Sequence, residues 1–234
     1  MIKLERTSVM NLDNALRGMR NPMQSWNKAD SHHCADGGLY EGACEHEGCL
    51  LNFPDCMMCG GYVVGKNDLD LAQRLTGAGS DHRKFLRQIF VSVDVTAPLY
   101  WWKEYDTYKV GTVANSTSTM HKIHSKEFSR EDFSCDRMSD VALTCLDYVI
   151  DVLEERRQKY LETKDTAYWH DMIQLLPTSY NQMRTCTLNY ENLLNIYFAR
   201  RHHKLDEWHT YCDWIAGLPY FKHMCIEPME EKNG

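Results

Sequence analysis

The chain has 234 residues, of which 43% are hydrophobic, so it can bury a core and is expected to form one domain over residues 1–234. Its net charge of −7 and its pI of about 5.9 disfavour general affinity for nucleic acid. No apolar run is long enough to span a bilayer, and the first residues lack the apolar stretch of a signal peptide. We therefore expect a cytoplasmic protein without nucleic-acid or membrane partners.

Residues 31–65 are expected to be a Cys-rich insertion within this domain, because their composition is Gly-rich and shows no periodicity. In a cytoplasmic protein, cysteines are thiols or metal ligands more often than disulfides. Zinc takes four ligands in a tetrahedron, and the insertion offers one C-x4-C pair and one C-x2-C pair. The candidate ligands are Cys44, Cys49, Cys56 and Cys59. Neither pair completes a two-knuckle pattern, so a structural zinc site and a loop of free thiols both remain open.

The elements that follow the insertion alternate in type. Residues 67–78 begin with a capping Asn or Asp and end near glycines, which predicts a short helix. Residues 89–98 alternate between apolar and polar side chains, which predicts a half-buried strand ending at Pro98. Amphipathic periodicity predicts helices over three later segments: 142–160, 168–176 and 206–215. We expect a mixed α/β (α+β) domain, with a frayed end at EPMEEKNG.

A hydroxyl-rich stretch, residues 112–119, lies between the predicted strand and the first of these helices. Its hydroxyl and backbone N–H groups could bind phosphate oxygens, or form a turn that satisfies its own backbone. Just before it, the aromatic run 100–102 either lines a site or fills the core. Cys186 and Cys212 fall in apolar helical patterns and are expected to be buried, inert thiols, so no catalytic residue is identified.

Residues 187–208 carry the strongest functional pattern and are predicted to form one helix. Asn189 and Asn195 lie about 600° apart around such a helix, so they occupy different faces. A molecule that contacts both must be long, as a flavin dinucleotide is, or must be bound by several subunits. Arg200 follows with a fork suited to a phosphate or a pyrimidine edge. The alternative is an amphipathic helix with polar edges.

The second half of the chain has the order Leu-Pro, Asn, Leu, Asn and Arg, which resembles the pattern of the flavin-dependent thymidylate synthases. It is carried here by Leu176-Pro177, Asn189, Leu193, Asn195 and Arg200. His82 stands before the strand that ends in Ala97-Pro98, at the position where that family has a histidine that contacts flavin. The resemblance covers most of the chain and is interrupted by the Cys-rich insertion.

The family signature is Arg-His-Arg, two residues, Ser, one residue, Asn-Glu, one residue, Ser, one residue, Arg-Tyr, and this chain resembles a degraded version of it. Lys109 stands at the last arginine of the triplet and Thr112 at the first serine; with one extra residue, Asn115 matches the asparagine and Ser118 the second serine. The departures are Thr107, Tyr108, Ser116 and Met120, which replace Arg, His, Glu and Arg. Lys109, His121, Lys122 or Arg184 could supply the missing charge.

The resemblance implies reductive methylation of dUMP to dTMP by a homotetramer whose sites are shared between subunits. FAD would be the cofactor, with methylenetetrahydrofolate as carbon donor and NADPH as reductant, and no cysteine nucleophile would be needed. The expected cofactor contacts are His82, Asn189, Asn195 and Lys109. The expected substrate contacts are Arg200, Ser118, Arg184 and Asn115, where Arg184 is either a family arginine shifted by one position or an ordinary surface residue. The eroded signature leaves two alternatives: an inactive flavin- or nucleotide-binding homologue, and an enzyme for another pyrimidine nucleotide.

Overall fold

A computed structural model describes residues 2–34 and 58–233 of the chain. Contacts divide the chain into two compact units. Unit 1 comprises Met1–Lys3, Asp94–Thr107 and Ala114–Thr185, and unit 2 comprises Leu4–Val93, Tyr108–Val113 and Cys186–Gly234. The fold is mixed α/β, as the sequence predicted. That the whole chain acts as one domain stays a prediction. None of the described helices is both long and apolar enough to cross a bilayer.

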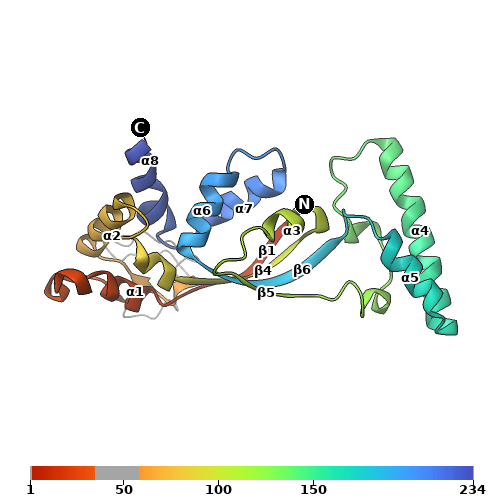
Figure 1. The fold of residues 1–234 in the computed structure, drawn as a ribbon, viewed down its shortest axis with the longest axis horizontal. Coiled ribbons are helices and arrows are strands. Elements are labelled where there is room, and N and C mark those ends of the chain that lie inside the picture. Colours follow the sequence, from red (N-terminus) through yellow and green to blue (C-terminus); the bar gives the residue numbers. More distant parts are fainter. Residues whose placement is uncertain (1, 35–57, 234) are drawn as a thin grey trace. The chain divides into compact units, whose positions relative to one another are not determined.

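A four-stranded sheet among the described residues has the order β1-β4-β6-β5 (Figure 1). Its strands are β1 (Lys3–Met10), β4 (Phe90–Pro98), β5 (Val113–Ser116) and β6 (Asn181–Asn189). The predicted strand is confirmed as β4, because Val91, Val93 and Val95 are buried while their neighbours are more exposed. The other three strands were not predicted.

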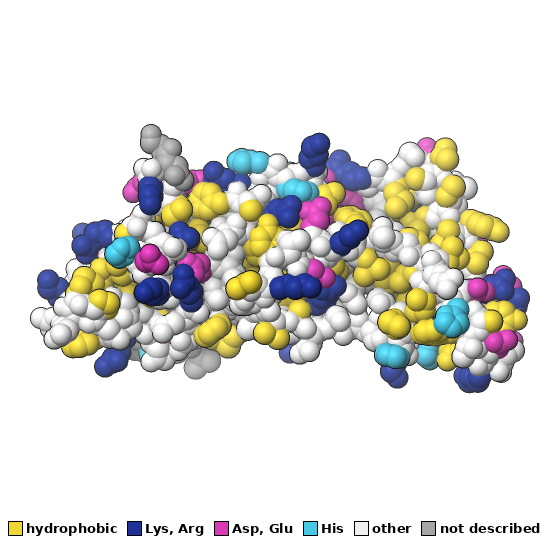
Figure 2. Space-filling view, viewed as in Figure 1, with side chains coloured by type: hydrophobic (Ala, Val, Ile, Leu, Met, Phe, Trp, Pro, Cys, Tyr) yellow, Lys and Arg dark blue, Asp and Glu magenta, His cyan; other side chains and the backbone are white. Residues whose placement is uncertain are grey.

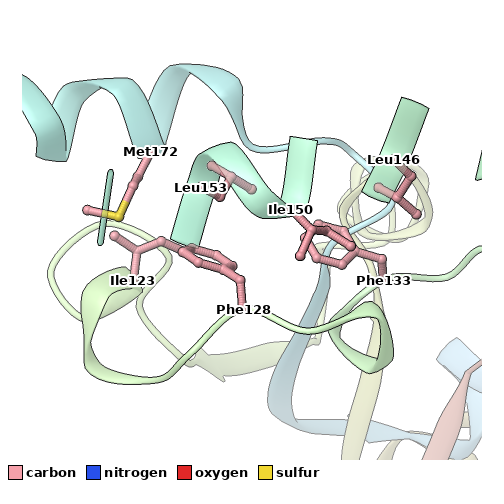
Figure 3. Packing of buried hydrophobic residues seen from close by; sticks show 7 residues of the cluster. All are labelled: Ile123, Phe128, Phe133, Leu146, Ile150, Leu153 and Met172. Carbon is pink, nitrogen blue, oxygen red and sulfur yellow. The ribbon is translucent and has the colours of Figure 1, made fainter. Parts of the chain in front are cut away.

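In unit 1, α4 (Asp140–Thr163) packs against α5 (Thr166–Leu175), and both confirm predicted helices. Each begins at a side-chain cap, with Ser139 accepting a hydrogen bond from the N–H of Ala142 and Asp165 from that of Ala167. The helices enclose an apolar cluster with the preceding loop (Figure 3). Its buried members are Ile123, Phe128, Phe133, Leu146, Ile150, Leu153 and Met172.

Unit 1 also contains α3 (Leu99–Tyr105), which holds the whole aromatic run 100–102. Trp101 and Trp102 are completely buried, so these two side chains fill the core. The indole N–H of Trp102 donates to the carbonyl of Gln182 on β6, 2.9 Å away, which satisfies the polar atom of this buried ring.

The helices of unit 2 are α1 (Leu12–Met19), α2 (Lys66–Ala78), α6 (Tyr190–Arg200), α7 (Asp206–Ala216) and α8 (Glu227–Asn233). The predicted helices over 67–78 and 206–215 are confirmed as α2 and α7. The prediction that the segment EPMEEKNG is frayed was wrong, because Glu227–Asn233 form the helix α8. Two of its side chains contact residues that are far away in sequence. Glu230 pairs with Arg201 at 2.5 Å, and the Met229 sulfur accepts a hydrogen bond from Arg83.

The prediction of one helix over residues 187–208 was also wrong. Residues 187–189 end β6, α6 spans only Tyr190–Arg200, and α7 starts separately at Asp206. Cys186 therefore lies on a strand, although it is buried as expected. Helical spacing of leucines cannot reveal this boundary, because Leu188 is buried equally well on the strand.

Two short strands, β2 (His32–His33) and β3 (Tyr62–Val63), pair antiparallel on either side of residues 35–57. Behind them, the Asp68 carboxylate pairs with Arg20 at 2.6 Å and accepts hydrogen bonds from Ser31. Asp30 in turn accepts from the N–H groups of Asn67 and Asp68, so α2 is capped by a residue far from it in sequence. This network, in which Arg20 and Asp68 are buried, holds both ends of the predicted insertion, because the N–H of Gly65 also donates to the Ser31 hydroxyl at 3.0 Å.

Candidate functional site

The start of α6 is fixed by two asparagines that cap each other. The Asn189 side-chain oxygen accepts from the N–H of Asn192 at 3.0 Å, and the Asn192 side-chain oxygen accepts from the N–H of Asn189 at 3.3 Å. The cap occupies the Asn189 oxygen, while its amide N–H groups can still donate. Asn195, in the middle of α6, is exposed.

Residues 108–113 lie along α6, although the residues on both sides of them in sequence belong to unit 1. The amide of Asn192 donates to the carbonyl of Val110 at 2.8 Å. Gly111 has a φ of 76°, and a Cβ added there would lie 3.0 Å from the Asn192 side-chain oxygen. The close approach therefore requires glycine. We call residues 108–113 the strap.

Arg200, at the end of α6, is bound by the strap and by α7. Its Nε donates to the Tyr108 hydroxyl at 2.8 Å. Its guanidinium carbon lies 5.5 Å from the Tyr108 ring centre and 4.9 Å from that of Trp208. Tyr108 stands where the family signature has histidine. In this chain that substitution places a phenol against the predicted substrate arginine.

His82 is exposed and lines a hollow of about 430 Å³ in unit 2. Met19, Leu75 and Phe85 form apolar parts of its wall. The 3-10 helix at Lys84–Gln88 begins two residues after His82. The hollow has an apolar wall beside an imidazole side chain, and this combination suits the binding of a flat ring.

Glu191, on α6, ties the segment after His82 to the start of α6. Arg83 and Arg87 both donate to its carboxylate, the former at 3.1 Å. Burial would raise the pKa of Glu191, but the hydrogen bonds from Arg87 and Arg83 outweigh it and lower the pKa, so the carboxylate stays charged. His82 immediately precedes Arg83, and Asn189 lies two positions before Glu191. Both residues are therefore held close to this ion pair.

Arg184, on β6 in unit 1, is largely buried. Its guanidinium carbon lies 4.2 Å from the Trp102 ring centre, and its Nη1 pairs with Asp106 at 2.8 Å. Its Nε donates to the side-chain oxygen of Gln182 at 3.0 Å. An ordinary surface arginine would have neither the stack nor these partners. Sequence reasoning missed Asp106, which lies 78 residues away.

Ser118 lines a second hollow, of about 540 Å³, in unit 1. Asn115 is exposed on β5. The predicted residues therefore fall into two groups. His82, Asn189, Asn195, Lys109 and Arg200 belong to unit 2, and Asn115, Ser118 and Arg184 belong to unit 1. Lys109 is an exposed member of the strap.

Three of the predicted zinc ligands, Cys44, Cys49 and Cys56, lie outside the described residues. Cys59 is buried, and its thiol is 3.8 Å from the carbonyl of Tyr62. Within residues 2–34 and 58–233, no three His, Cys, Asp or Glu side chains are grouped as metal ligands. The zinc site stays a prediction.

No protein-family model and no curated protein matches the sequence. Solved structures do resemble the chain. Thymidylate Synthase X from Helicobacter pylori, with FAD and dUMP, has a TM-score of 0.61 at 14% identity, covering 98% of each chain. The UMP/dUMP methylase PolB from Streptomyces cacaoi, bound with 5-Br UMP, has a TM-score of 0.58 at 13% identity, covering 98% of this chain and 94% of its own. The fold of this chain is that of the flavin-dependent thymidylate synthases, which confirms the resemblance at the level of fold.

Proposed function

We propose that the protein methylates dUMP reductively to dTMP, with FAD as cofactor, methylenetetrahydrofolate as carbon donor and NADPH as reductant. The observation that carries the proposal is the fold: over 98% of the chain it matches a structure that holds FAD and dUMP. The residues of the family pattern at His82, Asn189, Asn195 and Arg200 add support, since all four lie in unit 2.

The donors of unit 2 fit a flavin dinucleotide. His82 is exposed beside a hollow with an apolar wall, and Asn195 is exposed on α6. Lys109 is exposed on the strap and carries a charge that suits a pyrophosphate. Asn189 keeps its amide donors while its oxygen caps α6. A bound flavin would supply the reducing equivalents.

The chain's own part is to bind and orient. In this proposal His82 contacts the flavin ring, and the amides of Asn189 and Asn195 donate to polar atoms of the cofactor. The proposed nucleotide contacts of unit 1 are Arg184, which is stacked and paired, Ser118 and Asn115, and that of unit 2 is Arg200, which is stacked. Each arginine is held against an aromatic face, which lowers the entropic cost of ordering its side chain.

We also propose that the protein is a homotetramer with shared sites. One face of α4 supports this, because Val141, Cys145 and Tyr148 are exposed at helical i, i+4, i+7 spacing. Val141 is 77% and Tyr148 is 71% exposed. Hydrophobic side chains gather on the surface over α4 (Figure 2). Exposed apolar stripes of this kind mark protein contacts.

The alternative is a homologue that binds flavin or nucleotide but has lost synthase activity. The contact between Tyr108 and Arg200 favours it, because the guanidinium Nε already has a partner within the chain. A cytoplasmic location fits either function.

Purification and assay of the full chain separate the two. The enzyme should be yellow, bleach with NADPH and form dTMP from dUMP and methylenetetrahydrofolate, and its gene should rescue a thymidine auxotroph. His82→Ala and Asn195→Ala should lower flavin content, while the exposed control His202→Ala should not. Yellow protein that forms no dTMP would support the alternative. Colourless protein that does not bind dUMP would refute both functions. Metal analysis tests the insertion: zinc well below about one ion per chain would refute a structural zinc.

A further inference from the structure

Tyr108, the first residue of the strap, contacts the guanidinium of Arg200 in two ways. Its hydroxyl oxygen accepts a hydrogen bond from the Arg200 Nε at 2.8 Å, and its ring centre lies 5.5 Å from the guanidinium carbon. The hydrogen bond sets where the guanidinium lies, and the attraction of the cation to the ring adds to this hold. One side chain therefore restrains the arginine through both its polar and its aromatic part.

Trp208, on α7, provides a second aromatic surface for the same group. Its ring is completely buried, and its centre lies 4.9 Å from the guanidinium carbon of Arg200. The rings of Tyr108 and Trp208 meet edge to face, with centroids 6.1 Å apart. Trp208 also packs edge to face on Tyr211 at 5.9 Å, so its own position is fixed. Arg200 thus contacts two rings that also contact each other.

The strap brings Tyr108 to this place without help from a ligand. Two residues after Tyr108, the carbonyl of Val110 accepts from the Asn192 amide on α6 at 2.8 Å. The N–H of Thr112 donates to the carbonyl of Lys109 at 3.2 Å, which closes a turn between these points. The strap is therefore bound to α6 near its first turn, through Asn192, and at its last residue, through Arg200.

The type of side chain at position 108 decides how this hold responds to acid. The family signature has histidine here, and this chain has Tyr108. An imidazole nitrogen accepts a hydrogen bond only while it is unprotonated, and near pH 6.5 the ring gains a charge that repels a guanidinium. A phenol oxygen accepts without gaining a positive charge in acid. Tyrosine therefore supplies Arg200 with an acceptor that protonation does not remove.

We propose that Tyr108 is a positioning residue that holds the Arg200 guanidinium in the orientation that binds the nucleotide. The bond from Arg200 to Tyr108 uses Nε and neither of the two Nη atoms, which form the edge that suits a phosphate or a pyrimidine. The inference rests on the proposed function for the ligand of Arg200, dUMP. The hydroxyl then prepares the arginine for binding, whereas in an inactive homologue it would block it.

Calorimetry on the full chain with dUMP tests the sign of this effect. Tyr108→Phe keeps the ring and removes the acceptor, so the Kd for dUMP should rise by about fivefold or more. The matched control is Tyr168→Phe, because the Tyr168 ring also faces an arginine, Arg156, whose guanidinium carbon is 5.7 Å from its centre. This control should leave the Kd unchanged. Unchanged or tighter binding by Tyr108→Phe would overturn the proposal.

A double-mutant cycle tests whether Tyr108 acts through Arg200. Arg200→Lys removes both the Nε donor and the fork, and should weaken dUMP binding by itself. In that background, Tyr108→Phe should have little further effect on the Kd, because the group that it positions is gone. A general structural role of Tyr108 would instead make the two losses additive, and additive losses would overturn the proposal.

Tyr108→His provides a pH-dependent readout. At about pH 8 its neutral imidazole should bring dUMP affinity to within about threefold of the parent, and at about pH 5.5 affinity should fall at least about fivefold further below the parent. The comparison uses the ratio to the parent at each pH. This cancels the titration of the dUMP phosphate, with a second pKa of about 6, and of the neighbouring groups that both proteins share. These groups are His203, whose ring lies 6.2 Å from that of Trp208, and Asp206 and Glu207 in the first turn of α7.

A ratio that does not change with pH would overturn the role of the acceptor. If circular dichroism shows that Tyr108→Phe is unfolded, Tyr108→His at the two pH values keeps the test, since each protein is then compared with itself.

The outcomes separate this proposal from the proposed function. Tyr108-dependent binding of dUMP by a colourless, inactive protein would keep the positioning role and refute the synthase. Flavin-dependent dTMP formation with an unchanged dUMP affinity in Tyr108→Phe would keep the synthase and overturn the positioning role. Equal losses of flavin and dUMP in Tyr108→Phe would also overturn it, since the whole strap would then have been displaced.

Discussion

At the scale of single residues, Tyr108 holds Arg200 through both its ring and its hydroxyl. Tyr108→Phe keeps the ring and removes the acceptor of the Arg200 Nε, so the free energy of unfolding should fall by about 1 kcal/mol. Urea denaturation measures the change, and Tyr148→Phe, at a 71% exposed position, is the control. An unchanged stability would mean that water replaces the hydroxyl at no cost.

Asp68 makes stability depend on pH. Burial would raise the pKa of Asp68, but hydrogen bonds from Ser31 and Arg20 outweigh it and lower the pKa below the ordinary value of 3.8. The stabilisation is therefore complete above that value and is lost as the pH falls through the lower pKa of the folded state.

Urea denaturation between neutral pH and about pH 3 should show the parent losing stability below about pH 4. Asp68→Asn should be less stable than the parent at neutral pH and should lose less stability as the pH falls. Asp70→Asn, an exposed position on the same helix, is the control. Parallel acid profiles for parent and Asp68→Asn would contradict the assignment.

The sequence could single out candidate site residues but not the residues that they contact. Spacing singled out Asn189 and Arg200, while Tyr108 registered only as a departure from a pattern. One partner of Arg200, Tyr108, lies 92 residues away, and one partner of Arg184, Asp106, lies 78 residues away. Contacts of this range depend on the folded chain, and local periodicity carries no information about them.

At the scale of elements, prediction succeeded where one face of a segment is buried. α2, α4, α5, α7 and β4 each have a clear apolar period. It failed at the junction of β6 and α6, because Leu188 and Leu193 satisfy a strand and a helix equally well. It failed at α8, because charged side chains at the end of a chain reveal no partner until Arg83 and Arg201 are brought near.

The packing of α4 onto its cluster sets the stability of unit 1. Leu153 is completely buried in this cluster. Leu153→Ala should therefore lower the free energy of unfolding by about 2–5 kcal/mol, from lost burial and the cavity left behind. Chemical denaturation followed by circular dichroism measures this. Leu161→Ala, on the same helix but 39% exposed, should cost much less, and equal costs would contradict the packing.

At the scale of the whole molecule, the exposed stripe on α4 predicts self-association. Tyr148→Glu places a charge on this stripe and should shift the protein toward smaller species, because burying an unpaired carboxylate opposes the contact. Size-exclusion chromatography with light scattering measures the mass. The control is Gln158→Glu, which adds the same charge at another exposed position of α4. A mass unaffected by Tyr148→Glu would place the contact elsewhere.

The fold persists at 14% identity because a core tolerates many apolar substitutions that keep its volume and pattern. Binding residues have no such freedom, since each must supply a particular donor. This explains why the fold could be predicted from a partial motif, whereas candidate site residues could be proposed only where the motif survives. Tyr108 lies where it does not.

The hydrogen bonds around Asp30, Ser31 and Asp68 have a practical consequence for engineering. The N–H of Cys34 donates to the carbonyl of Gly61 at 2.8 Å, so these two residues are neighbours in the fold. Because the described contacts already hold them together, a segment of a different length can join them at little further cost in loop-closure entropy. A folded peptide or a fluorescent reporter could be grafted at the same place, which makes it a natural attachment point on this scaffold.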